Sequence, residues 1–147
     1  MTQGEMCDVL KDFFTTELHA VDARATDLIL STDVVLTVGG VCTLAQGQKL
    51  VGACVVRNAP NDDPTEGRRG FAKTPELGEA VWVYDLRADK GDHTVRFATR
   101  INTWIAMLEI READTQTAEG DLHLTDDDKR KSVQFLTELT TKFAVNG

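Results

Sequence analysis

One stretch, residues 34–57, constrains the fold more than any other part of the sequence. It is rich in β-branched residues, and glycine stands at 39–40, at 47 and at 52. Valine and threonine favour strands, and short glycine turns suit hairpins because glycine accepts a positive φ. We therefore expect three antiparallel strands here, at 34–38, 41–45 and 50–57, joined by the two glycine-containing turns.

Two further elements have clear patterns. Apolar residues at helical spacing predict an N-terminal helix over about residues 4–20, which would bury Phe13 and Phe14. The same spacing predicts a C-terminal helix over 126–143, and the capping box that starts at Thr125 marks where it begins.

The stretch 94–110 fits two structures. Its large apolar residues fall at helical spacing, and these are Phe97, Ile101, Trp104, Ile105 and Leu108. Strand alternation also holds from Val95 to Ile101 and then fails at Thr103-Trp104. We expect a helix over 94–110, and the alternative is a hairpin that turns at residues 100–103.

These elements predict an α+β fold. An antiparallel sheet, formed by the meander 34–57 and a strand at 80–87, would be covered by the N-terminal helix, the helix 94–110 and the C-terminal helix. The chain of 147 residues suits a single domain, 1–147. The side chains expected to be buried together in its core are Phe13, Phe14, Trp104, Leu136 and Leu139.

The connection 58–78 is the most unusual segment of the chain. It has 21 residues and holds all three prolines, whereas connections in compact domains are usually about 4–6 residues long. Long connections of this kind are often functional, so we interpret it as a long arm or loop that contacts a partner. Its candidate partner-binding residues are Arg68, Arg69, Phe71 and Leu77.

Charge and cysteine content narrow the function classes. The formal net charge is −8, which repels phosphate backbones, so no nucleic-acid partner is expected. The first 14 residues carry no basic region and no long apolar run, so no signal peptide is expected. The longest apolar stretch, 34–48, is interrupted by glycines and polar residues and cannot span a bilayer, so no membrane partner is expected. Three cysteines, an odd number, favour reduced thiols and a cytoplasmic, intracellular location.

The sequence predicts no catalytic, cofactor-binding or metal-binding residues. Cys42 and Cys54 lie in apolar strand contexts, where thiols are buried and unreactive. The cluster at 89–93 lacks the alternating oxygen ligands of a calcium loop and is interpreted as a polar turn.

We therefore expect a non-enzymatic protein that acts through protein–protein contacts. It would be a structural or assembly subunit, for example in a viral or phage particle, and would bind another protein or itself as a homo-oligomer. The predicted order of elements is similar to that of small acidic type III secretion chaperones, which implies a chaperone as one alternative. A small-ligand-binding or enzymatic α+β domain, with a pocket between sheet and helices, is the other.

Overall fold

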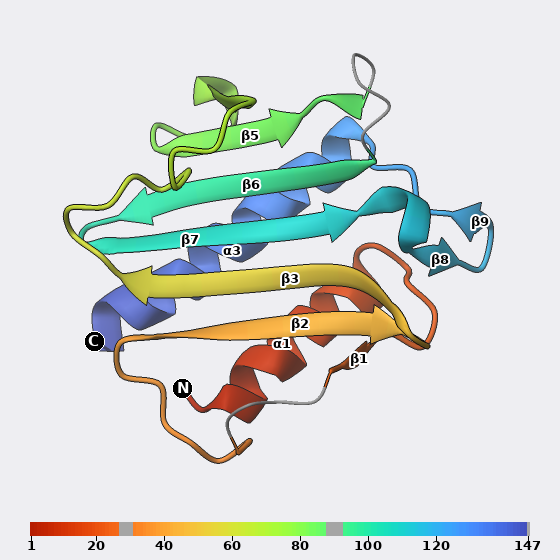
Figure 1. Cartoon of the computed structure of the whole chain (residues 1–147), viewed down its shortest axis with the longest axis horizontal. Helices are drawn as coiled ribbons and strands as arrows, with labels where there is room; N and C mark the ends of the chain where they lie inside the picture. Colours follow the sequence, from red (N-terminus) through yellow and green to blue (C-terminus); the bar gives the residue numbers. More distant parts are fainter. Residues whose placement is uncertain (27–30, 88–92, 147) are drawn as a thin grey trace.

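The computed structural model describes residues 1–26, 31–87 and 93–146, so most of the predicted turn at 89–93 lies outside the described residues. The described residues form a seven-stranded antiparallel sheet with strand order β1-β2-β3-β7-β6-β5-β4 (Figure 1). Both long helices lie on the same face of this sheet, behind the strands in Figure 1. The α+β class predicted from the sequence is confirmed.

The elements are α1 (Gln3–Thr16), β1 (Arg24–Ala25), β2 (Gly39–Gln46), β3 (Lys49–Asn58), β4 (Phe71–Lys73), η1 (Pro75–Leu77), β5 (Val81–Asp85), β6 (Thr94–Ile101), β7 (Trp104–Arg111), η2 (Glu112–Asp114), β8 (Gln116–Thr117), β9 (Gly120–Asp121) and α3 (Asp126–Asn146).

Helix α1 begins with a capping box. The Thr2 hydroxyl accepts a hydrogen bond from the Glu5 backbone N–H at 3.1 Å, and the Glu5 carboxylate accepts one from the Thr2 N–H at 2.7 Å. The helix ends at Thr16, one turn earlier than predicted. The chain reverses there, since His19 adopts a left-handed backbone with a φ of 60°. Val21 is consequently exposed instead of lying on the buried stripe.

Helix α3 begins as the sequence predicts. The Thr125 hydroxyl accepts a hydrogen bond from the Asp128 N–H, and the Asp128 carboxylate accepts one from the Thr125 N–H. The helix packs against β6 and β7, while α1 packs against β2. The five side chains predicted to share the core are all buried in one apolar cluster: Phe13, Phe14, Trp104, Leu136 and Leu139.

The strands predicted at 41–45 and 50–57 are confirmed. They fall within β2 and β3, which pair in the antiparallel sense and are joined by a two-residue turn at Gly47. Gly47 has a φ of 61°, the conformation for which a glycine was expected in this turn. The strand predicted at 80–87 is confirmed as β5.

The helix predicted over 94–110 is wrong. The stretch forms the β6–β7 hairpin, with Ile101 paired to Trp104 across a turn in which Asn102 has a φ of 54°. The helical spacing has a simple origin in the hairpin. The two turn residues separate Ile101 from Trp104 by three positions, so the residues that face the helices are odd-numbered in β6 and even-numbered in β7. The order of elements therefore lacks the central helix on which the likeness to type III secretion chaperones rested.

The strand predicted at 34–38 is also wrong, as is the hairpin turn at the glycine pair. Backbone groups of this segment bind the start of α1, where the Gln3 N–H donates to the Val34 carbonyl at 2.9 Å. Gly39 instead begins β2, with a φ of 138°. A Cβ at this position would lie 2.1 Å from the carbonyl oxygen of Val56, so glycine is required by the close approach of β3.

The cysteines differ from the expectation of three reduced thiols. Cys7 on α1 and Cys42 on β2 form a disulfide that ties the helix to the sheet. Cys54 is a buried free thiol, as predicted, and lies directly opposite Cys42 in the β2–β3 register. Burial raises the pKa of the Cys54 thiol to about 12, so this side chain stays protonated and unreactive.

Candidate interaction surface on the open face of the sheet

The two faces of the sheet have different surroundings. Gly52 of β3 faces Phe14 of α1, and Trp104 of β7 packs on Phe143 of α3 at 5.5 Å between ring centroids. Because side chains alternate along a strand, the residues between these point away from both helices. We call this second side the open face. Its side chains are Val41 and Thr43 of β2, Ala53, Val55 and Arg57 of β3, Phe71 and Lys73 of β4, Trp82 and Tyr84 of β5, Arg96, Ala98 and Arg100 of β6, and Ile105, Met107, Glu109 and Arg111 of β7.

A row of apolar side chains crosses the open face. Direct cross-strand pairing joins Trp82 to Ala98, Ala98 to Met107, Met107 to Val55, and Val55 to Val41. We call these five residues the apolar row. Trp82, Met107 and Val55 are only half-buried, and Val41 is 52% exposed. The row therefore presents apolar surface to solvent from β5, β7, β3 and β2, whereas Ala98 of β6 is fully buried between its neighbours in the row.

A second row beside it combines aromatic and charged groups. Phe71 packs against Tyr84 with 5.8 Å between ring centroids, and the Arg96 guanidinium lies 4.8 Å from the centre of the Tyr84 ring. Arg96 then donates to the Glu109 carboxylate at 2.9 Å, and Arg111 donates to the same carboxylate at 3.1 Å. We call these five residues the mixed row. Arg96 and Glu109 are held in place by this cross-strand contact, and Arg111 is held by its contact with Glu109 along β7.

On its other side the apolar row is bordered by residues 59–70, which we call the arm. Arg57 pairs with Asp62 at 2.8 Å and with Glu66 at 3.1 Å, which fixes the arm to β3. Pro64 and Thr65 are buried, and Pro64 lines a small pocket with residues of the open face. The long connection is thus an ordered arm seated across one end of the strands.

The open face and the arm are basic in a chain that is acidic elsewhere. Together they hold four acidic residues and seven basic ones, a net charge of +3, whereas the remaining 20 acidic and nine basic residues give −11. The seven basic residues are Arg57, Arg68, Arg69, Lys73, Arg96, Arg100 and Arg111. This separation of charge could not be read from the sequence, in which acidic and basic residues are interspersed.

The four candidate partner-binding residues do not lie together. Phe71 belongs to the mixed row, and Arg68 and Arg69 are exposed at the adjoining end of the arm. Leu77, in η1, lies apart from them and packs against the core on the helix side. The contributions of β6 and β7 were not foreseen because a helix was preferred over 94–110, whereas the alternative hairpin that turns at residues 100–103 is confirmed. The alternation from residue 95 to 101 was the signal that could have revealed them.

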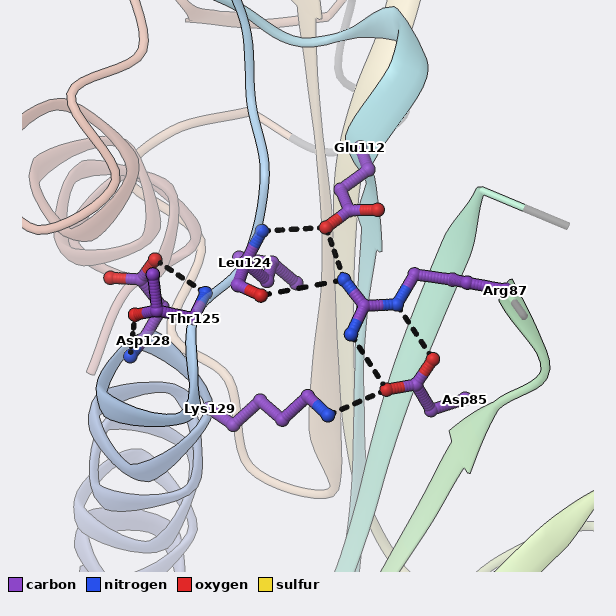
Figure 2. Close-up of polar contacts among 7 residues, drawn as sticks. All are labelled: Asp85, Arg87, Glu112, Leu124, Thr125, Asp128 and Lys129. Carbon is purple, nitrogen blue, oxygen red and sulfur yellow. Dashed lines mark hydrogen bonds and ion pairs between the residues drawn. The ribbon is translucent and has the colours of Figure 1, made fainter.

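A cluster of ion pairs holds the start of α3 against β5 (Figure 2). Arg87 donates to both carboxylate oxygens of Asp85, at 2.7 and 2.9 Å, and also to the buried Glu112 carboxylate. Lys129 of α3 reaches Asp85 at 2.6 Å, and the Glu112 carboxylate accepts a hydrogen bond from the Leu124 N–H at 2.6 Å. Burial raises the pKa of Asp85, but the bonds from Arg87 and Lys129 outweigh it and hold the pKa below its ordinary value. Every charge in the cluster is thereby paired, which gives it a structural role.

Three pockets lie on the helix side and at the end of the sheet. One of about 470 Å³ lies beside the ion-pair cluster and is lined by Leu77, Val83 and Lys129 among others. A groove of about 400 Å³ runs between α1 and α3, where Phe13 and Phe135 stack with 4.6 Å between ring centroids. The first of these lies between the sheet and α3, which is the location given in the alternative prediction, whereas no residue of the described strands lines the groove.

The third pocket brings together two histidines that are distant in the sequence. His19 and His123 line a cavity of about 550 Å³ together with Glu17 and Asp128. Their convergence depends on the chain reversal after α1, so sequence spacing gave no sign of it. Within residues 1–26, 31–87 and 93–146, no group of three or more histidine, cysteine or acidic side chains is arranged to hold a metal ion.

In the described part of the chain, no helix combines the length and the apolar character needed to cross a membrane. Comparisons of the chain with protein-family models, with curated proteins and with solved structures found no match.

Proposed function

We propose that the protein is a non-enzymatic interaction module that binds another polypeptide on the open face of its sheet. The observation that carries this proposal is the apolar row. Exposed apolar surface that is bordered by polar groups is typical of protein-binding sites, because its removal from water favours association. On the other face, the apolar side chains of the described strands are already buried beneath α1 and α3.

The dimensions of the face are compatible with a specific contact. Six strands from β4 to β2 give five spacings of ~4.8 Å, so a row across the sheet is about 24 Å long. With strands of about 26 Å, the face covers on the order of 600 Å². A typical stable interface buries about 800 Å² on each partner, so the arm must contribute to the contact. The interface would then have an apolar centre with charged residues at its rim.

The contacts on the face favour a polypeptide over nucleic acid. Bases bind open sheets by stacking on free aromatic rings. Here the Tyr84 ring is covered by Arg96 and flanked by Phe71, while Lys73 lies 5.8 Å from the centre of the Trp82 ring. Aromatic surface is therefore already in contact with the protein's own cations, and what remains exposed is largely the aliphatic part of the apolar row.

The proposal is tested by placing charges in the apolar row. The variant carrying Val41→Glu and Met107→Glu should lose a partner that the wild-type chain captures by cross-linking from its source cells, while the melting temperature and circular dichroism stay close to wild type. Val145→Glu is the matched control, because Val145 is 77% exposed at the end of α3, away from the open face. Light scattering of the same proteins shows whether the captured partner is a second copy. Capture that both variants retain equally would refute the use of the open face.

A further inference from the structure

We infer that the occupant of the open face is an acidic segment of another protein, in which carboxylate side chains alternate or mix with apolar ones. This inference rests on the proposed function and adds the chemical class of the partner. Its basis is the charge distribution: the open face and arm carry a net +3 on a chain whose other residues carry −11. A partner that contacts the apolar row must lie among these basic residues.

The width of the exposed strip favours a single segment. Successive residues on one face of a strand are about 6.7 Å apart, so the mixed row and the arm lie on either side of the apolar row at roughly that distance. The mixed row supplies Arg96 and Arg111, which share the single carboxylate of Glu109 at 2.9 and 3.1 Å. Two guanidinium groups on one carboxylate leave net positive charge beside the apolar row, where a second carboxylate would be attracted.

Exposed cations extend this positive region to the edge of the sheet. Lys73 on β4 and Arg69 in the arm are both exposed, and Lys73 lies beside Trp82 at the end of the apolar row. Arg68 precedes Arg69 in the arm and lies 3.9 Å from the carboxylate of Glu66. An acidic segment lying along the apolar row would meet these groups at one end and the Arg96–Arg111 pair near its middle.

A second copy of the chain fits this site less well. Each copy would bring a net charge of −8, and like charges repel over roughly a Debye length of 10 Å at about 0.1 M salt. Some acidic groups on the helix side are also engaged within the chain. Asp127 is paired with Arg130 and Lys131, and Glu17 is also paired with Lys131. A short acidic segment of another protein meets only the local positive field of the open face.

The experiment measures binding of a labelled peptide by fluorescence anisotropy. The probe is a 15-residue synthetic peptide that alternates glutamate with leucine and phenylalanine, and its partner probe has glutamine in place of every glutamate. The open-face variant carries Arg69→Glu and Lys73→Glu. The matched control carries Lys11→Glu and Lys142→Glu, which make the same change in charge at exposed positions of α1 and α3.

We expect the acidic peptide to bind the wild-type chain and the helix-face control with affinities within about twofold of each other. The open-face variant should bind about tenfold more weakly at about 50 mM salt, and the difference should shrink at about 300 mM salt because screening weakens exposed ion pairs. The glutamine peptide should bind every protein weakly and without this salt dependence.

Several results would overturn the inference. These are equal binding of the glutamine peptide, equal weakening in both charge variants, and tighter binding of a 15-nucleotide single-stranded DNA that the open-face changes abolish. A wild-type mass that rises with concentration while peptide binding disappears would also overturn it, in favour of a second copy. If the charge changes have no effect on partner capture but the apolar-row variant loses it, the partner class is wrong and the proposed function stands. If neither affects capture, both fail.

Discussion

A methyl group added to Gly52 should destabilise the protein through a clash with one aromatic ring. A Cβ at Gly52 would lie 2.1 Å from Cζ of Phe14, and 2.8 and 2.9 Å from Cε2 and Cε1 of the same ring. The ring has little room to move away, because Phe14 is fully buried and lies edge-to-face against Phe13 with 6.0 Å between centroids. Gly52→Ala therefore tests whether α1 is packed on β3 as described.

The expected cost has two opposing parts. Overpacking a filled core destabilises the protein by about 1–3 kcal/mol. Replacing glycine by alanine within a strand stabilises it by about 0.5–1 kcal/mol, because alanine loses less backbone entropy on folding. A clash at 2.1 Å lies at the severe end of this range. We therefore expect Gly52→Ala to lower the free energy of unfolding by about 2 kcal/mol, which lowers the melting temperature by roughly 4–8 °C.

The assay is urea unfolding followed by circular dichroism, applied to a double-mutant cycle. Phe14→Leu alone should cost about 1–3 kcal/mol, because it leaves part of the ring's volume empty. In the double variant the added methyl group fills that space, so the total loss should be smaller than the sum of the two single losses by about 1 kcal/mol or more. Ala53→Ser on the open face is the control and should change stability by less than about 0.5 kcal/mol. A wild-type stability for Gly52→Ala, or strictly additive losses, would refute the packing of α1 on β3.

Three further predictions concern other parts of the molecule. Because the pKa of Asp85 is held below its ordinary value of 3.8, its ionised form stabilises the fold fully above about pH 4 and less as the pH falls through the lowered pKa. Asp85→Asn should thus reduce stability at pH 7, and urea melts should show the difference shrinking in acid; a constant difference would contradict this. Alkylation followed by mass spectrometry should give no adduct on the native protein, one adduct at Cys54 after denaturation, and three after reduction frees Cys7 and Cys42; rapid native labelling would contradict the burial. Asn102→Ala should cost about 1 kcal/mol because alanine resists the positive φ of 54°, whereas Asn102→Gly should be nearly neutral in the same denaturation assay, and equal effects of both would argue against this turn.

Local sequence patterns determined the two long helices and part of the sheet. The start of each helix follows from a capping box, at Thr2 for α1 and at Thr125 for α3, because the groups that satisfy the first backbone donors are within three residues. The β2–β3 hairpin follows from Gly47, since the turn requires a positive φ that glycine adopts freely. Burial of the apolar stripe on each helix could also be predicted, because residues at helical spacing form one apolar face.

Only the tertiary structure decided the structure of 94–111 and of 34–38. In the first, helical spacing and strand alternation fit the same apolar residues. The choice depends on the pairing of β6 with β5 and of β7 with β3, and the residues of β3 lie at least 46 positions before their partners in β7. In the second, β-branched residues suggested a strand, but their backbone groups are satisfied by the start of α1. Local propensity could not foresee either partner.

The candidate surface was beyond sequence reasoning for the same physical reason. Each side chain of the apolar row comes from a different strand, so no stretch of sequence contains two of them in contact, and the row exists only through the sheet register. The connection 58–78 was recognisable from its length and prolines, and its Phe71 lies on the surface as part of the mixed row. Leu77 faces the core instead, because η1 turns the chain towards the helix side. Composition fixed the net charge of the protein, and the fold alone placed the basic residues together on one face.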